Sequence, residues 1–185
     1  EGEETSADAV EAADGVARKM GRQIVHVKDV PGFLVNRIWL MMANEADWAV
    51  VQGEAKSLFE VDSAAKYKLG LPMGLFELDD VLQGGSIETR FHVLENFREN
   101  LGESYGPAPL VKEAFKQKHF GKAFGAGFYD WSAGKTNEIP MNAGAAFDPI
   151  RVLANGINEC AKLIEAGSTT TEEIDRAVLY GLNYP

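Results

Sequence analysis

The chain has 185 residues, of which 45% are hydrophobic and 25% charged, a composition typical of a globular protein with one good core or two small ones. Its formal net charge of −10 argues against nucleic acid and anionic membrane surfaces as partners, because both attract clustered Lys and Arg. The single Cys160 allows no internal disulfide, and no apolar run reaches the roughly 18 residues that span a bilayer. We therefore expect a protein of the cytoplasm that does not enter a membrane.

The first thirty residues predict a helix followed by a strand. Ser6 is a typical N-cap, and the alanine-rich stretch after it favours a helix near residues 6–20. Residues 23–28 are short, β-branched and partly alternating, which favours a strand, and the turn at Pro31 and Gly32 ends it.

The rest of the chain predicts helices separated by turns rich in Gly, Pro and Ser. Residues 33–52 are apolar on nearly every side in their first half, which is typical of a buried helix. Shorter helices are expected at 61–69, 75–82, 87–100 and 110–118. Residues 121–131 combine glycines with large aromatic side chains, a pattern that indicates a tight backbone path. Residues 132–147 have the composition of a linker.

An internal repeat follows that linker. At one constant offset, Arg37, Asn44, Glu45 and Gly53 recur as Arg151, Asn158, Glu159 and Gly167. After a deletion of one residue, Asp62, Tyr67 and Pro72 likewise match Asp175, Tyr180 and Pro185. We therefore divide the chain into residues 1–30, a first copy at 31–131, the linker at 132–147 and a second, degenerate and truncated copy at 148–185.

The second copy is expected to be a scaffold. Its counterpart of Asn36 is Ile150, so it lacks the polar side chain that the first copy has at this position. Because Arg37, Asn44 and Glu45 recur even without that asparagine, we assign them to an internal polar network instead of to chemistry.

Three ordered segments of the first copy carry a family resemblance. They are residues 27–37 (VKDVPGFLVNR), 70–78 (GLPMGLFEL) and 121–129 (GKAFGAGFY). In these segments the chain resembles the C-terminal domain of L-3-hydroxyacyl-CoA dehydrogenases, which occurs as a tandem repeat in the larger multifunctional members. The resemblance implies an all-α fold like the C-terminal domain of 6-phosphogluconate dehydrogenase, here duplicated. It also implies that residues 1–30 are the helix and strand that end a missing Rossmann domain.

The implied activity is oxidation of 3-hydroxyacyl-CoA to 3-oxoacyl-CoA in fatty-acid β-oxidation, with NAD bound by the missing N-terminal domain. A dinucleotide site has a fingerprint in which Gly-x-Gly-x-x-Gly lies between a strand and a helix, and this sequence has no such fingerprint. In the family, the general base and the glutamate that orients it precede the junction that corresponds to residues 27–37. The isolated fragment is therefore expected to be inactive. The implied partners are the acyl-CoA substrate, the Rossmann domain and, as in multifunctional members, a fused enoyl-CoA hydratase domain.

The resemblance also assigns site residues. It places Asn36 in the active site, where its amide would hold the thioester carbonyl or the catalytic imidazole. Without the resemblance, Asn36 would be interpreted as a cap of the long helix. Met73 and Leu78 match positions that line the family's acyl pocket, although such residues at a helix entry are more often plain core. No histidine has a second ligand at metal-binding spacing, and Cys160 is expected to be an inert core thiol.

Two alternatives stay open at this point. A related enzyme could act on 3-hydroxybutyryl-CoA or on another hydroxy acid, and a helical module without chemistry could bind an acyl-CoA or a partner. In the family, the second copy packs on the first as the partner subunit does in dimeric enzymes. We therefore expect a pseudo-dimer within the chain, with a homodimer as the alternative.

Overall fold

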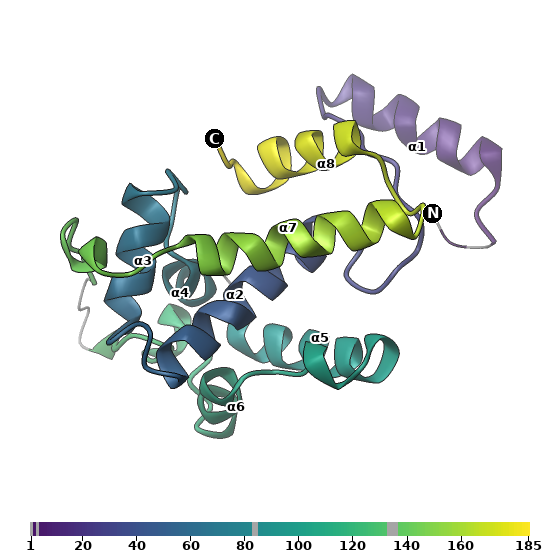
Figure 1. Cartoon of the computed structure of the whole chain (residues 1–185). Coiled ribbons are helices and arrows are strands. Elements are labelled where there is room, and N and C mark those ends of the chain that lie inside the picture. Colours follow the sequence, from purple (N-terminus) through teal and green to yellow (C-terminus); the bar gives the residue numbers. More distant parts are fainter. Residues whose placement is uncertain (1, 3, 83–84, 133–136) are drawn as a thin grey trace.

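A computed structural model describes residues 2, 4–82, 85–132 and 137–185, and these residues form an all-helical fold (Figure 1). The α-helices are α1 (Ala7–Lys19), α2 (Val35–Val51), α3 (Leu58–Tyr67), α4 (Leu75–Val81), α5 (Ser86–Leu101), α6 (Pro109–Lys116), α7 (Ile150–Glu165) and α8 (Thr171–Ala177). Short turns of helix are η1 (Glu103–Tyr105), η2 (Lys122–Phe124), η4 (Ala143–Ala145) and the π-helix η5 (Val178–Leu182), which continues α8. The all-α prediction is confirmed, with helix ends shifted by a few residues.

The strand expected at residues 23–28 does not form. These residues have no regular secondary structure, and no strand lies among the residues that the structure describes. A strand needs a neighbouring strand to complete its backbone hydrogen bonds, which an apolar, β-branched pattern alone cannot provide. The backbone N–H of Lys28 instead points at the carbonyl of Ser168, at 3.5 Å.

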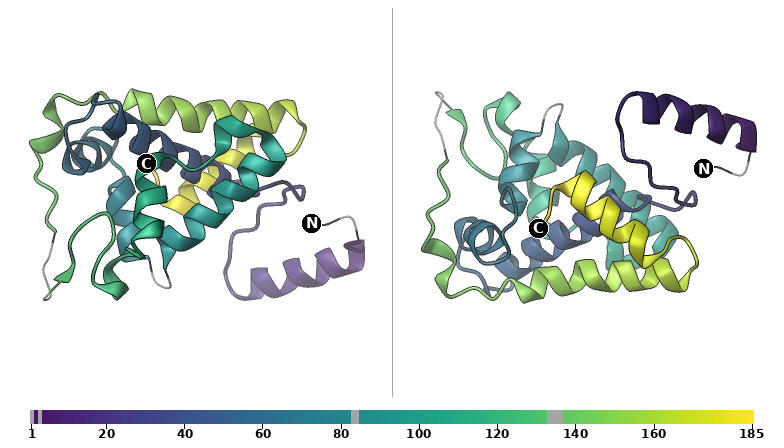
Figure 2. Two further views of the ribbon diagram at one scale, coloured as in Figure 1. Left: turned by 90° about the horizontal axis from the view of Figure 1, so that it is seen from below. Right: turned by 90° about the horizontal axis from the view of Figure 1, so that it is seen from above.

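Helix α1 lies apart from the rest of the fold (Figures 1 and 2). None of its residues is buried, and Val16 and Met20, at its end, are 58% and 65% exposed. Ser6 caps it as expected, since its hydroxyl accepts a hydrogen bond from the backbone N–H of Ala9 at 3.3 Å. The apolar side chains of Val16 and Met20 are therefore left largely uncovered by the described residues.

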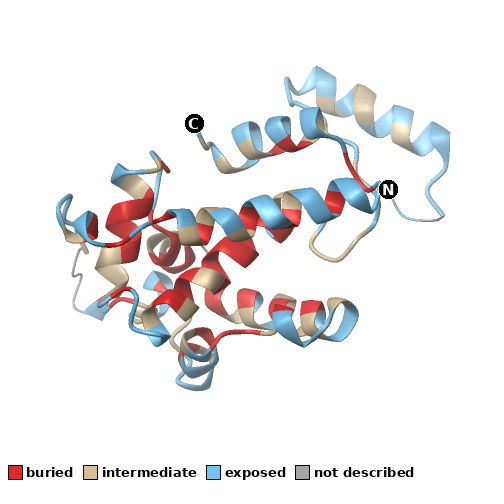
Figure 3. Ribbon diagram, viewed as in Figure 1, coloured by how far each residue is buried: buried red, intermediate tan, exposed pale blue. Residues whose placement is uncertain are grey.

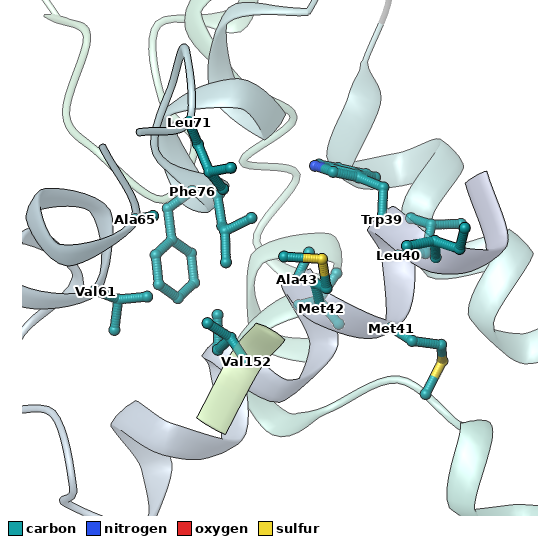
Figure 4. Packing of buried hydrophobic residues seen from close by; sticks show 14 of the residues in the cluster. Trp39, Leu40, Met41, Met42, Ala43, Val61, Ala65, Leu71, Phe76 and Val152 are labelled. Carbon is teal, nitrogen blue, oxygen red and sulfur yellow. The ribbon is translucent and has the colours of Figure 1, made fainter. Parts of the chain in front are cut away.

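Helix α2 is the central element, and it is buried along most of its length (Figure 3). Among the described residues, the contact between α2 and α7 is more extensive than that between any other two elements. Trp39, Met42 and Ala43 of α2 belong to a core that also contains Phe76 of α4 (Figure 4). The helices approach closely at Gly156 of α7, where a Cβ atom would lie 2.7 Å from Met42 Cγ.

A buried charge cluster joins α2, α4 and α5. The fully buried guanidinium of Arg90 pairs with Asp47 at 3.1 Å and with Asp79. Burial raises the pKa of each carboxyl to about 6, against the attraction of Arg90, which lowers it. Because removing one member would leave a buried charge without its partner, this cluster fixes the relative positions of the three helices.

Two buried aspartates organise the glycine-rich segment 121–131. Asp80 accepts hydrogen bonds from the backbone of residues 128 and 129 and from Trp131 Nε1, each at 2.8 Å. Asp62 accepts from two N–H groups at the start of α4 and from the hydroxyl of Tyr129. A Cβ atom on Gly127 would lie 2.0 Å from Asp80 Oδ1, so only glycine fits there. The expected tight path is therefore present.

The expected linker packs on α3 in the part that is described; residues 133–136 lie outside the described residues. Gly144 is buried, and a Cβ atom there would lie 2.4 Å from the backbone nitrogen of Ala64. Lys68 donates to the carbonyl of Phe147 at 2.8 Å, and Tyr67 donates to that of Ile139 at 3.2 Å. This segment, which leads into α7, is therefore held against α3.

Candidate functional site

A left-handed turn sets the direction in which α2 begins. Gly32 and Phe33 have φ angles of 78° and 49°, and a Cβ atom on Gly32 would lie 2.3 Å from Cζ of Phe97. Glycine is therefore required at position 32 both by the backbone and by the packing. The turn delivers the chain into α2 with Asn36 in its first turn.

The Asn36 side chain is exposed and has no hydrogen-bond partner among the described residues. The N-cap of α2 is Leu34, and no side chain caps this helix end, so the interpretation of Asn36 as a cap is wrong. An amide that is free to donate and to accept can bind a carbonyl oxygen or an imidazole of another molecule or domain.

Two hollows meet at Asn36. The junction hollow, of about 380 Å³, is lined by Gln23, Val25, Val27, Gly32, Phe33, Leu34, Val35, Asn36, Arg176, Ala177, Tyr180 and Gly181. The helix hollow, of about 340 Å³, is lined by Val35, Asn36, Trp39, Leu40, Leu78, Leu82, Ser86, Thr89, Arg90, Val93, Gly181 and Leu182. Both have the size of small-ligand sites, and the helix hollow is lined mainly by apolar side chains.

The structure brings together two of the three residues that the sequence analysis singled out. Asn36 and Leu78 both line the helix hollow. Met73 lies in the turn before α4, is 40% exposed and lines neither hollow. Gly181 and Leu182 also line the helix hollow, and the sequence analysis did not single them out because it expected the second copy to be a scaffold.

The buried side chain of Arg37 holds the turn before α2 in place. Arg37 donates from Nε to Glu159 Oε2 at 2.6 Å, from Nη1 to the carbonyl of Pro31 at 3.3 Å, and from Nη2 to Tyr105 Oη at 3.4 Å. Lys162 donates to the other oxygen of Glu159 at 2.7 Å. The polar network expected around Arg37 therefore ties α7 to the turn that precedes Asn36.

Two ion pairs join segments that the predicted sequence repeat matches with each other. Arg37 pairs with Glu159 at 2.6 Å, and Arg151 pairs with Glu45 at 2.7 Å. The sequence repeat matches Arg37 with Arg151 and Glu45 with Glu159. Each ion pair therefore joins the arginine of one repeat unit to the glutamate of the other. Reciprocity of this kind is the property of an interface with two-fold symmetry. The first pair is buried, whereas the second is partly exposed.

Other reactive groups have structural surroundings. Cys160 is half-buried, and burial raises the pKa of its thiol, which lowers its reactivity. Within residues 2, 4–82, 85–132 and 137–185, no three His, Cys, Asp or Glu side chains gather as metal ligands. No helix in this part of the chain is both long enough and apolar enough to cross a membrane.

Comparison with known proteins identifies the family. Residues 32–131, which include Gly32, Asn36 and Leu78, match the family described as 3-hydroxyacyl-CoA dehydrogenase, C-terminal domain. This match covers more than half of the chain, so the chain belongs to the 3-hydroxyacyl-CoA dehydrogenase family.

Individual relatives agree with this assignment. The chain is 38% identical over 130 residues to a probable 3-hydroxybutyryl-CoA dehydrogenase of Bacillus subtilis, a match that covers 70% of this chain and 42% of the relative. A crystal structure of (S)-3-hydroxybutyryl-CoA dehydrogenase from Ralstonia eutropha is 31% identical, with a TM-score of 0.64, over 70% of this chain and 45% of that one.

A third relative shares the fold of the whole chain. The structure of 3-hydroxybutyryl-CoA dehydrogenase from Escherichia coli K12 covers 100% of this chain with a TM-score of 0.81, at 20% identity. The matched region is 57% of that protein, so the chain spans about half the length of the relatives it matches.

Proposed function

We propose that the chain is the substrate-binding and assembly region of an NAD-dependent 3-hydroxyacyl-CoA dehydrogenase of fatty-acid β-oxidation in the cytoplasm. The observation that carries this proposal is the exposed amide of Asn36, free of hydrogen-bond partners in the described residues and placed where two ligand-sized hollows meet. Leu78 lines the hollow in which the acyl chain would lie. Met73 lies apart, so the proposal does not depend on it.

In the proposed reaction, a hydride leaves C3 of the substrate for NAD, and the proton of the 3-hydroxyl group passes to a general base. The family resemblance assigns NAD and that base to a nucleotide-binding domain outside these residues. Asn36 would donate from its amide to the thioester carbonyl or hold the catalytic imidazole in place. Residues 1–185 alone are then expected to be inactive.

The exposed helix α1 supports the assignment of NAD and the general base to a separate nucleotide-binding domain. We assign residues 1–30 to the end of the nucleotide-binding domain, as the sequence suggested. That domain would cover the apolar side chains of Val16 and Met20, which are exposed here. A fused enoyl-CoA hydratase domain, as in the multifunctional members, stays an expectation.

The names of the relatives favour a short acyl chain. The three proteins compared above are named 3-hydroxybutyryl-CoA dehydrogenases. We therefore keep 3-hydroxybutyryl-CoA as the alternative to longer acyl-CoA substrates for the same site.

We also propose that the two copies form a pseudo-dimer within one chain. The reciprocal ion pairs of Arg37 with Glu159 and of Arg151 with Glu45 support this arrangement. Because these contacts are intramolecular, the midpoint of urea unfolding should not depend on protein concentration. A midpoint that rises with concentration, together with a dimer in sedimentation, would favour a homodimer instead.

The function is tested with the complete protein that carries this region. We expect NADH to form when NAD is mixed with 3-hydroxyacyl-CoA substrates, measured by absorbance for short, medium and long acyl chains. Acyl-CoA binding without NADH formation from any substrate would favour the non-catalytic helical module.

A further inference from the structure

We propose that Gly181 and Leu182, at the end of the second copy, form one wall of the acyl pocket beside Asn36 and limit the length of the acyl chain. This inference rests on the proposed dehydrogenase function and deepens it. It gives the degenerate copy a role in substrate selection, in addition to its role in assembly.

The end of the second copy lies directly against the start of α2. A Cβ atom on Gly181 would lie 2.9 Å from Cγ2 of Val35, the residue before Asn36. This separation is shorter than normal carbon contacts, so the backbone of Gly181 packs on α2 without space between them. Gly181 borders both hollows that meet at Asn36.

Leu182 contributes an apolar side chain to the helix hollow. It is half-buried, packs against the core cluster and lines the hollow together with Leu78 and Val93. Apart from Gly181 and Leu182, all residues that line this hollow lie between Val35 and Val93 in the first copy. The second copy therefore supplies a wall that the first copy does not provide.

A wall of this kind selects by size. In an apolar pocket, one methylene group more or less changes kcat/KM by roughly 10-fold to 200-fold, because it either fills space or collides with a side chain. Shortening Leu182 would lengthen the space available to the acyl chain, and enlarging it would shorten that space. Opposite substitutions at one position should thus move the preference in opposite directions.

The test uses the complete enzyme and the ratio of kcat/KM for a medium-chain to that for a short-chain 3-hydroxyacyl-CoA. For Leu182→Ala we expect this ratio to rise about tenfold, and for Leu182→Phe we expect it to fall by a similar factor. Leu179→Ala is the matched control, because Leu179 lies in the same π-helix, is 48% exposed and lines a different groove, beside Cys160. It should leave the ratio unchanged.

The outcomes separate failure of the proposed wall from failure of the proposed function. If the unaltered enzyme is active and neither Leu182 variant changes the ratio, the wall is refuted while the dehydrogenase function stands. An equal change in Leu179→Ala would also refute it, because the effect would then be general loosening of the segment. Absence of activity in the unaltered enzyme with every substrate would overturn the proposed function and this inference with it.

Discussion

Neutralising Glu159 and neutralising Glu45 should have very different effects, although the sequence repeat matches the two residues. In the first pair, the side chains of Arg37 and Glu159 are 7% and 0% exposed. Breaking such a buried pair from one side costs about 3 to 5 kcal/mol, because the remaining charge has neither water nor a counter-ion. In the second pair, the side chains of Arg151 and Glu45 are 19% and 24% exposed, and pairs open to solvent contribute about 0.2 to 1 kcal/mol.

The second pair also has substitutes within reach. Arg151 contacts Glu54 and Gln52, so it keeps polar partners when Glu45 is changed. We therefore expect Glu159→Gln to lower the free energy of unfolding by about 3 kcal/mol and Glu45→Gln to lower it by less than about 1 kcal/mol. Equal losses, measured by urea unfolding followed by circular dichroism, would show that burial does not decide the contribution of each pair.

Two further predictions concern the first copy. Gly32 and Gly53 both have a φ of 78°, but only at Gly32 would a Cβ atom meet another residue. Gly53→Ala should therefore lower the free energy of unfolding by about 1 kcal/mol, from backbone strain alone. Gly32→Ala should lower it by about 1 to 3 kcal/mol more, because of the added clash. Equal unfolding free energies of the two variants would contradict this. Burial raises the pKa of the Asp62 carboxyl to about 7 in the folded state, whereas an aspartate in the unfolded chain has a pKa of about 4. Between about pH 4 and pH 7, the folded state therefore holds a proton on Asp62 that the unfolded state releases. Its contribution to stability is therefore greatest below about pH 4 and is lost as pH rises toward 7. Asp62→Asn should flatten this part of the stability profile, and an unchanged slope would show that Asp62 is ionised throughout.

The helices were predictable because their signals are local. The apolar pattern of residues 33–52 and the Ser6 cap depend on residues close in sequence, and α2 and α1 form close to the expected bounds. The Pro31-Gly32 junction was predictable as a turn for the same reason. That only glycine fits at position 32 became visible in the structure, because the clash involves Phe97.

The features that could not be predicted depend on contacts between distant segments. The strand at 23–28 fails because no strand is available for pairing in the described residues. The burial of Arg90 between Asp47 and Asp79 follows from the packing of three helices. The position of Leu182 beside Asn36 follows from how η5 packs on α2, which no short pattern encodes.

Asn36 is proposed to act on the substrate or on the catalytic base. The most direct test is kcat/KM of Asn36→Ala in the complete enzyme, together with its unfolding free energy. We expect kcat/KM to fall by about 10² to 10³, the loss typical of one preorganised donor, with stability almost unchanged because the side chain is exposed and makes no hydrogen bond to the described residues. Unchanged kinetics in a folded variant would contradict the claim and remove Asn36 from the site.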